Sequence, residues 1–401
     1  MRIQNIRIKN FKVLRDVNIA NIPQMAVFLG MNGSGKSTLF DVFGFLHDCL
    51  LTNVKAALSK RGGFKEVISR EEKGNIEFEI KFKPDKDEPL VTYVLHIGQN
   101  DQNDISVKRE ILKFRRGSSG SPWHMLDFSN GKGFAIEGSP KNYKSLNHEK
   151  AKRANQQLDS PDILAIKGLG QFKEFPAIST FRKLIEDWHV SDFHIEDART
   201  TRDAGYSEQL SATGDNLSLV AKYMFENHKD KFDAILKKMS ERVPGVKDVQ
   251  AEETVDGRIV LRFQDGKFKD PFAARYVSDG TIKMFTYLML LSDPKPHALL
   301  CIEEPENQLY PLLLSELAEE FRQYSNNGAQ VFISTHSPDF LNAVAIEELY
   351  CLIKKDGYTK IYRARENELV TSLFEGGDLL GYLWNQGLLT EGFGNENSIS
   401  R

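Results

Sequence analysis

A glycine-rich octapeptide near the N-terminus carries the clearest chemical signal in this sequence. Residues 30–37 read Gly-Met-Asn-Gly-Ser-Gly-Lys-Ser, which matches the phosphate-loop pattern G-x-x-x-x-G-K-[ST] at every fixed position. The glycines let successive backbone N–H groups turn inward around phosphate oxygens, at a helix N-terminus whose dipole also favours anions. We therefore predict an ATP-binding loop. Its predicted nucleotide-binding residues are Gly30, Asn32, Gly33, Ser34, Gly35, Lys36, Ser37 and Thr38.

The last residues of this loop have distinct expected roles. Lys36 is placed to reach the β and γ phosphates, Ser37 to put its hydroxyl on Mg²⁺, and Thr38 to sit beside the α phosphate. An apolar run, Met25–Leu29, precedes the loop, and residues 39–50 follow it with apolar side chains at helical spacing. Strand, loop and helix thus occur in the order that the motif requires. The alternative is a glycine-rich turn that happens to precede a helix.

Two adjacent carboxylates follow a second apolar run. Ala298–Ile302 is typical of a buried parallel strand, and Glu303 and Glu304 come directly after it. A carboxylate at such a strand end can hold Mg²⁺, and its neighbour can orient or deprotonate the attacking water. We assign Glu303 to the metal, together with Ser37, and Glu304 to catalysis as the general base. A charged strand end without chemistry is the alternative.

A third apolar run, Gln330–Ile333, ends in a polar triplet that includes His336. The carboxyl ends of parallel strands meet at one edge of a sheet, so we expect His336 beside the Glu pair, where it would contact the γ phosphate or the water. Ser337 as N-cap and Pro338 at the first helical position then predict a helix. Taken singly, His336 fits an ordinary capped strand end. Its place downstream of the Glu pair favours a catalytic residue.

The fourth feature is the segment Ser278-Asp279-Gly280-Thr281, which precedes the apolar helix Ile282–Leu291. The Ser278 hydroxyl and the backbone N–H groups at Gly280 would form a second anion site at this helix N-terminus. Ser278 and Gly280 are therefore also predicted to bind nucleotide, through its phosphates. Because the chain already has a phosphate loop, a second site makes sense if it closes over the nucleotide of another copy. A capped helix start is the alternative, and the segment taken alone favours it.

In order and spacing, these four elements resemble the ATPase heads of the ABC superfamily, in the soluble branch with SMC proteins and the OLD-like ATPases of bacterial genome defence. Residues 302–311 are similar to the OLD-like motif E-E-P-E-x-x-L-H-P, with Tyr310 in place of the usual His. Residues 278–281 are similar to the short signature of that group, and residues 10–12 to the turn of its first hairpin. The resemblance covers residues 1–97 and 270–350. It leaves Gln171 as a weak candidate for the glutamine loop.

The resemblance implies a head-to-tail homo-dimer, or a higher homo-oligomer, that sandwiches ATP and Mg²⁺ and opens on hydrolysis. The chain lacks the heptads of an SMC coiled coil, and about 65 residues after His336 are too few for a TOPRIM nuclease domain. We therefore expect a separate effector protein, a nuclease in anti-phage defence or DNA maintenance. The alternatives are a nucleotide-dependent scaffold or sensor with little hydrolysis, or the nucleotide-binding subunit of a transporter.

Composition restricts the location and the partners of the protein. The formal net charge of −3 gives no general attraction to nucleic acid or to an anionic membrane. Local basic clusters leave DNA contact open; they are Lys108, Arg109, Lys113, Arg115, Arg116, Arg199 and Arg202. No apolar run reaches the ~20 residues of a membrane helix. Three scattered cysteines without metal-ligand spacing favour a reduced compartment, so we expect a cytoplasmic protein without membrane partners.

The elements that position these residues predict an α/β fold, a P-loop NTPase of the ABC-ATPase type. We expect a mixed sheet, an N-terminal antiparallel β-subdomain and a helical signature lobe. The predicted division is one head, residues 1–401, with a nucleotide-binding lobe of residues 1–116 plus 292–401 and a loop-rich, helical signature lobe of residues 117–291.

The remaining expectations concern elements outside the motifs. Residues 117–157 are rich in Gly, Ser, Asn and Lys and predict long surface loops. Phe181–Val190 and the region 217–239 predict helices, and Asp256-Gly257 predicts a tight hairpin turn. The apolar cluster at residues 373–389 favours packing against the head, with a partner-docking site as the alternative.

Overall fold

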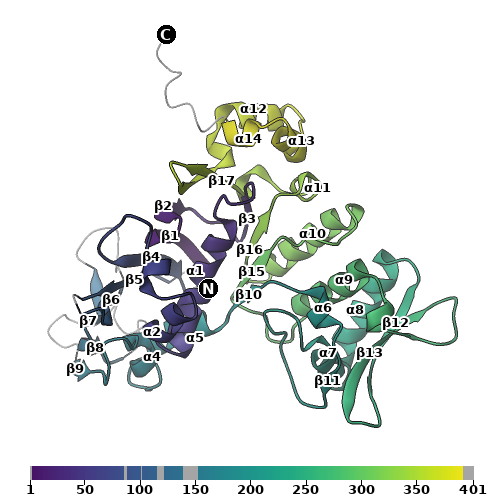
Figure 1. The fold of residues 1–401 in the computed structure, drawn as a ribbon, viewed down its shortest axis with the longest axis horizontal. Coiled ribbons are helices and arrows are strands. Elements are labelled where there is room, and N and C mark those ends of the chain that lie inside the picture. The colour runs from purple at the N-terminus through teal and green to yellow at the C-terminus, as the bar shows by residue number, and fades with distance from the viewer. Residues whose placement is uncertain (1, 85–87, 101, 115–121, 139–151, 392–401) are drawn as a thin grey trace.

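Two large sheets and a smaller one organise the chain. The computed structural model describes residues 2–84, 88–100, 102–114, 122–138 and 152–391 (Figure 1). The first sheet is antiparallel, with strand order β2-β1-β4-β5-β6-β7-β8-β9. Its strands are β1 (Arg2–Phe11), β2 (Leu14–Ala20), β4 (Ile76–Lys83), β5 (Val91–Gln99), β6 (Ile105–Phe114), β7 (Trp123–Ser129), β8 (Lys132–Ile136) and β9 (Arg153–Gln157).

The second sheet carries the motifs and has the order β10-β15-β16-β3-β17-β18. The first five strands are parallel, and β18 returns antiparallel to β17. The strands are β10 (Trp188–Ser191), β15 (Leu299–Glu303), β16 (Gln330–Thr335), β3 (Met25–Leu29), β17 (Leu349–Lys355) and β18 (Tyr358–Arg363). All five residues of β3 are buried, which explains their continuous apolar character, since strands of parallel sheets are covered on both faces.

Helix α1 (Lys36–Leu51) connects the phosphate loop to the core between the two sheets. Leu39, Phe43, Leu46 and Leu50 recur every three or four residues and are buried, as expected for a helix with one apolar face. The same core includes residues of four neighbouring helices. These are α2 (Val54–Ser59), α3 (Phe64–Val67), α4 (Ala165–Leu169) and α5 (Pro176–Glu186).

A second core covers the other face of the parallel sheet and continues into a helical lobe. In Figure 1 this lobe lies to the right of the sheets, and the C-terminal helices lie at the top. The lobe contains α6 (Ile195–Ala198), α7 (Leu217–Asn227), α8 (Lys229–Arg242), α9 (Asp279–Leu291), β11 (Arg202–Asp203), β12 (Val246–Glu253), β13 (Arg258–Asp265) and β14 (Phe272–Ala273). The later helices are α10 (Leu312–Asn326), α11 (Pro338–Leu341), α12 (Glu368–Glu375), α13 (Leu380–Asn385) and α14 (Leu388–Glu391).

This architecture confirms the predicted α/β class, with an antiparallel N-terminal sheet and a mixed sheet. The two helices of region 217–239 and the hairpin turn at Asp256-Gly257 are present as well. In the C-terminal cluster, Leu380, Leu383 and Leu389 are buried in the second core, as the packing interpretation requires. Among the described residues, no helix is both long and apolar enough to cross a membrane.

Two expectations for the middle of the chain need correction. The described parts of residues 117–157 form β7, β8 and β9 rather than loops; residues 115–121 and 139–151 lie outside the described residues. The helix expected at 181–190 ends at Glu186, and the chain continues as β10. Strands β7, β8 and β9 thus extend the first sheet, and β10 extends the second.

A buried carboxylate in the first core makes stability depend on pH. Glu110 of β6 accepts hydrogen bonds from the Tyr93 hydroxyl and from the backbone N–H groups of Ala165 and Ile166. Burial raises the pKa of Glu110 from 4.5 to about 7, although these hydrogen bonds oppose the shift. Between these values the folded chain binds more protons than the unfolded chain. The contribution of Glu110 to the free energy of unfolding therefore falls as pH rises from 4.5 to about 7.

We expect Glu110→Gln to weaken this pH dependence. Urea denaturation near pH 5 and near pH 8 should show a smaller loss of stability in the variant than in the wild type, by at most about 3 kcal/mol at ~1.4 kcal/mol per pKa unit. Glu241→Gln changes an exposed carboxylate of α8 and is the control. Equal losses of stability in the wild type and in Glu110→Gln would show that Glu110 is ionised throughout this range.

Candidate functional site

The predicted chemical residues meet at one edge of the parallel sheet. Strand β16 lies between β15 and β3, with Glu303 opposite Ser334 and Thr335 opposite Leu29. The carboxyl ends of the three strands therefore lie side by side. The phosphate loop follows β3, the Glu pair ends β15, and His336 follows β16. Topology thus brings together segments separated by about 300 residues of chain.

The phosphate loop is held tightly by its own glycines and by β18. Gly33 and Gly35 have backbone φ angles of +79° and +104°, which residues other than glycine rarely adopt. A Cβ atom at Gly35 would lie 2.3 Å from Oγ1 of Thr359, whose hydroxyl donates a 2.7 Å hydrogen bond to the Ser34 carbonyl. The Ser34 Oγ atom is buried and has no hydrogen-bond partner in the described structure. A glycine cradle with an unpartnered hydroxyl fits a phosphate ligand.

Lys36 connects this loop to Glu304. The side chain is buried, and its Nζ donates to the Gly30 carbonyl at 2.7 Å. The same Nζ lies 3.6 Å from Oε1 of Glu304. The ammonium group is therefore placed between the loop and the end of β15, where its charge can act on a phosphate and on the carboxylate together.

The two residues assigned to Mg²⁺ affect each other electrostatically. Burial raises the pKa of Glu303 and the nearby Ser37 hydroxyl lowers it, while the negative charges of Asp192 and Glu304 raise it further. A hydroxyl and a carboxylate in a site that penalises uncompensated negative charge form a donor set suited to a hard cation such as Mg²⁺. The residues present therefore fit the predicted metal.

Glu304 has the opposite electrostatic setting. Burial raises its pKa, but a hydrogen bond from Asn307 and the charges of His336 and Lys36 outweigh burial and hold the pKa below the ordinary value. Its backbone has a φ angle of +40°, which is unusual for a residue with a side chain. The backbone N–H donates to the Ser334 carbonyl at 3.0 Å. Glu304 is thus an ionised carboxylate, held at the end of β15 in a conformation that the neighbouring strand supports.

His336 completes the group at the sheet edge. Its Nδ1 lies 3.3 Å from Oε1 of Glu304. Ser337 is the N-cap of α11 and accepts a hydrogen bond from the Phe340 N–H, with Pro338 at the start of the helix, as predicted. The indole of Trp384, on α13, donates to the His336 carbonyl at 3.1 Å. The C-terminal helices therefore contribute to the position of this residue.

The structure adds Asp192 to the site and removes Gln171. Ser191 lies opposite Ile302 in the parallel register, so Asp192 follows β10 at the same edge as Glu303. Gln171 follows α4, is exposed and donates to the Lys167 carbonyl. It does not occupy the expected position of a glutamine loop. Sequence reasoning missed Asp192 because the four-residue strand before it was included in the predicted helix; the apolar Trp188 and Val190 were the available signal.

The Ser278 segment forms a separate feature on α9. The Ser278 hydroxyl caps this helix, accepting from the Thr281 N–H at 3.3 Å and contacting Oγ1 of Thr281 at 2.8 Å. A Cβ atom at Gly280 would lie 3.0 Å from the Gln308 carbonyl, so the helix start packs against the loop after β15. Arg199 also donates to the Val277 carbonyl and to Asp279. These contacts fix the segment, and none of them is with the phosphate loop.

Three arginines of the basic clusters considered for DNA contact are paired within the chain. Arg109 lies 2.7 Å from Asp127, Arg199 is paired with Asp279, and Arg202 with Asp215. Arg115 and Arg116 lie outside the described residues. Paired guanidinium groups have less free charge for a phosphate backbone, so these clusters do not strengthen the DNA alternative.

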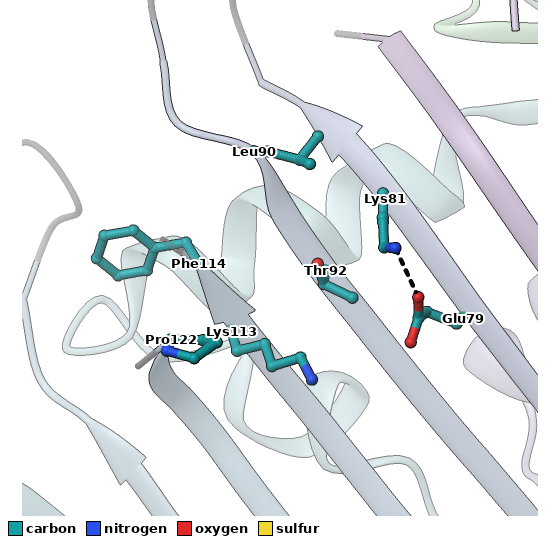
Figure 2. A pocket seen from close by; sticks show the side chains of 7 residues that line it. All are labelled: Glu79, Lys81, Leu90, Thr92, Lys113, Phe114 and Pro122. Atoms are coloured by element: carbon teal, nitrogen blue, oxygen red, sulfur yellow. Dashed lines mark ion pairs between the residues drawn. The ribbon is translucent and has the colours of Figure 1, made fainter. Parts of the chain in front are cut away.

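The described residues line two cavities, of which one reaches the predicted site. One, of about 400 Å³, runs between α1 and β10 and reaches Glu303; its lining also includes His47, Arg61 and His189. The other, of about 260 Å³, lies on β4, β5 and β6 of the antiparallel sheet, away from the motifs (Figure 2). There Lys81 points toward Glu79 at 3.0 Å, beside Thr92 and Lys113. The second cavity contains none of the predicted catalytic or nucleotide-binding residues.

Fold and site together define an α/β P-loop domain with an acidic strand end beside the phosphate loop. The family described as "AAA domain, putative AbiEii toxin, Type IV TA system" matches residues 25–342, and the chain belongs to this family. No curated protein matches the sequence.

Solved structures with a similar fold include heads of SMC proteins. An SMC head bound to the C-winged helix domain of ScpA has 14% sequence identity and a TM-score of 0.52, with 90% of this chain and 97% of that chain covered. The SMC head domain from Thermotoga maritima has 14% identity, a TM-score of 0.46, and coverage of 90% and 99%. The Pyrococcus furiosus Smc head with an extended coiled coil has 15% identity, a TM-score of 0.49, and coverage of 94% and 99%. At these identities the likeness concerns the fold alone.

Proposed function

We propose that this protein binds ATP with Mg²⁺, hydrolyses it, and associates with a second copy around the nucleotide. The observation that carries the proposal is the convergence of Lys36, Glu303, Glu304 and His336 at one sheet edge. Phosphoryl transfer to water requires a general base, a positive charge on the phosphates and a carboxylate that binds Mg²⁺. Glu304, Lys36 and Glu303 would supply these groups.

Each residue has a separate role in the proposed reaction. Mg²⁺, held by Ser37 and Glu303, would neutralise charge on the β and γ phosphates. Lys36 and the backbone N–H groups of the loop bind the phosphates. The ionised carboxylate of Glu304 accepts a proton from the attacking water. His336, adjacent to Glu304, donates to the terminal phosphate or to the water.

The association of two copies is supported by the Ser278 segment and by exposed apolar side chains. Ser278 caps α9, a second helix N-terminus suited to anions, and makes no contact with the phosphate loop of its own chain. Large apolar residues near the motifs are exposed: Met31 by 62%, Tyr276 by 70% and Tyr310 by 66%. Exposed apolar groups beside a functional site are typical of an interaction surface. A second copy would cover them and add its Ser278 and Gly280 to the nucleotide.

The resemblance to the OLD-like group extends the proposal to a partner. In this interpretation the ATPase acts in the cytoplasm and regulates a separate effector, a nuclease in anti-phage defence or DNA maintenance. The description of the family refers to a putative toxin of a toxin–antitoxin system, which agrees with a role in bacterial defence. A scaffold that binds ATP with little hydrolysis is the competing function, and measured turnover distinguishes the two.

Ser278→Arg tests the association. The long arginine side chain should cover the α9 N-terminus, so that a partner's nucleotide cannot reach it. The phosphate loop of the same chain should stay intact. We expect ATP affinity to stay within about twofold and ATP-dependent dimers to be lost, because one arginine in a packed interface costs several kcal/mol. Light scattering after size exclusion, with ATP or ADP, measures the dimer.

Asn367→Ala is the matched control for the loss of a helix cap. Asn367 caps α12 by accepting from the Val370 N–H, away from the Ser278 segment. This variant should dimerise like the wild type. Dimers that form equally with Ser278→Arg would contradict an interface at α9, and a wild type that remains monomeric with ATP would contradict the proposed association itself.

A further inference from the structure

Glu306, the third carboxylate after β15, is buried against the residues that carry His336. Its Oε1 atom accepts hydrogen bonds from the Thr335 hydroxyl at 2.8 Å and from the His336 N–H at 2.9 Å. The same oxygen lies 3.4 Å from Nδ1 of His336. The residue is only 9% exposed, and its Oε2 atom is buried without a hydrogen-bond partner among the described residues. A carboxylate in this position costs free energy unless its interactions compensate.

The His336 ring lies between two carboxylates with different surroundings. Oε1 of Glu304 lies 3.3 Å from Nδ1 and Oε1 of Glu306 lies 3.4 Å from it, with Glu304 the more exposed of the two side chains. Nδ1 itself is buried and makes no hydrogen bond to the described residues. The backbone is held on both sides of the residue, since Glu306 accepts from its N–H and Trp384 donates to its carbonyl. The side chain itself remains 42% exposed. The ring can therefore reach a ligand at the sheet edge while its base stays fixed.

We propose that Glu306 is a positioning residue that holds His336 toward the terminal phosphate of ATP. The proposal rests on the proposed function, because it assigns His336 to that phosphate. Glu306 acts on the backbone, since it accepts from the His336 N–H and from the hydroxyl of the preceding Thr335. The exposed ring is thereby directed to the sheet edge.

Nucleotide binding tests the role of Glu306 without turnover. In the Glu304→Gln background, Glu306→Gln keeps the shape of the side chain and one acceptor oxygen and removes the charge. We expect ATP affinity to fall about 10-fold, as for groups that orient a functional side chain, with ADP affinity unchanged. Titration calorimetry with each nucleotide measures both. Equal losses for ATP and ADP, or no loss for either, would overturn the proposal, because a general structural defect does not select the terminal phosphate.

A double-mutant cycle tests whether Glu306 acts through His336. In the otherwise wild-type chain, Glu306→Gln should lower kcat about 10-fold to 100-fold. In the His336→Ala background the same change should have little further effect, because the group that Glu306 orients is absent. Full additivity would overturn the proposal. If the wild type itself does not hydrolyse ATP, the proposed function fails, and the ATP-to-ADP affinity ratio still decides the role of Glu306.

A control carboxylate completes the design, and Glu348→Gln is the matched change. Glu348 is a partly buried carboxylate that accepts a backbone N–H, from Ala345, and pairs with Arg322, away from the site. Its kcat and ATP-to-ADP affinity ratio should equal those of the wild type.

Discussion

Glu304→Gln is expected to lower ATP turnover by about 10²-fold to 10⁴-fold, the range for loss of a general base, while ATP binding survives. Glu304 is ionised because Asn307, His336 and Lys36 outweigh the effect of burial on its pKa. Glutamine keeps the shape and the contact with Asn307 but cannot accept a proton. Phosphate release under saturating ATP measures the turnover. The ATP-bound dimer should accumulate, since the step that opens it is blocked.

Glu319→Gln is the control for this change. Glu319 lies on α10, is half-exposed and pairs with Arg322 at 2.8 Å, so its loss should leave turnover unchanged. Unchanged turnover in Glu304→Gln would contradict the assignment of the base. Loss of ATP binding together with turnover would instead indicate that Glu304 holds the loop through Lys36.

Lys36→Ala should abolish productive nucleotide binding. A lysine at this position makes charge-assisted hydrogen bonds to phosphate oxygens, each worth about 1.5–3 kcal/mol, so the ATP affinity should fall about 100-fold. The stabilisation that ATP gives to the folded chain should disappear with it. The increase in Tm with rising ATP concentration measures the effect, and turnover should fall below detection at ATP concentrations that saturate the wild type.

Lys229→Ala is the matched control for Lys36→Ala. Lys229 begins α8, is exposed and lies 3.5 Å from Asp233. This variant should retain the full ATP-dependent increase in Tm. Retention of the increase in Lys36→Ala would contradict a phosphate site at the loop. Without nucleotide, Lys36→Ala should unfold at nearly the wild-type temperature, because the lysine hydrogen bonds are made to the loop itself.

The motif-bearing elements could be predicted from the sequence because their signals are local. Met25–Leu29 is apolar throughout, the loop contains its glycines at fixed spacing, and residues 39–50 have helical periodicity. The strand before Glu303 and the N-cap at Ser337 follow from equally short patterns. The rule that parallel strands end at one edge then predicted that Glu303, Glu304 and His336 would be neighbours, and the structure places them so.

Other parts of the fold have no such local signal. Strand β9, Arg153–Gln157, is polar and almost fully exposed, so it shows no alternation of apolar and polar residues. Only its pairing with β8 makes it a strand. Strand β10 has four residues and directly follows a helix, which is too short for periodicity to separate it from that helix. Asp192 was missed for this reason.

The sequence by itself determined the phosphate loop, the acidic strand end and the class of the fold, because backbone conformation and burial leave a pattern within ten or fifteen residues. Only the tertiary structure decided which charges face one another. Glu306 contacts His336 across 30 residues, and Trp384 of α13 donates to the His336 carbonyl across 48. Such contacts depend on how separate elements pack. The free energy of a buried charge is set by these neighbours in space, which spacing along the chain does not specify.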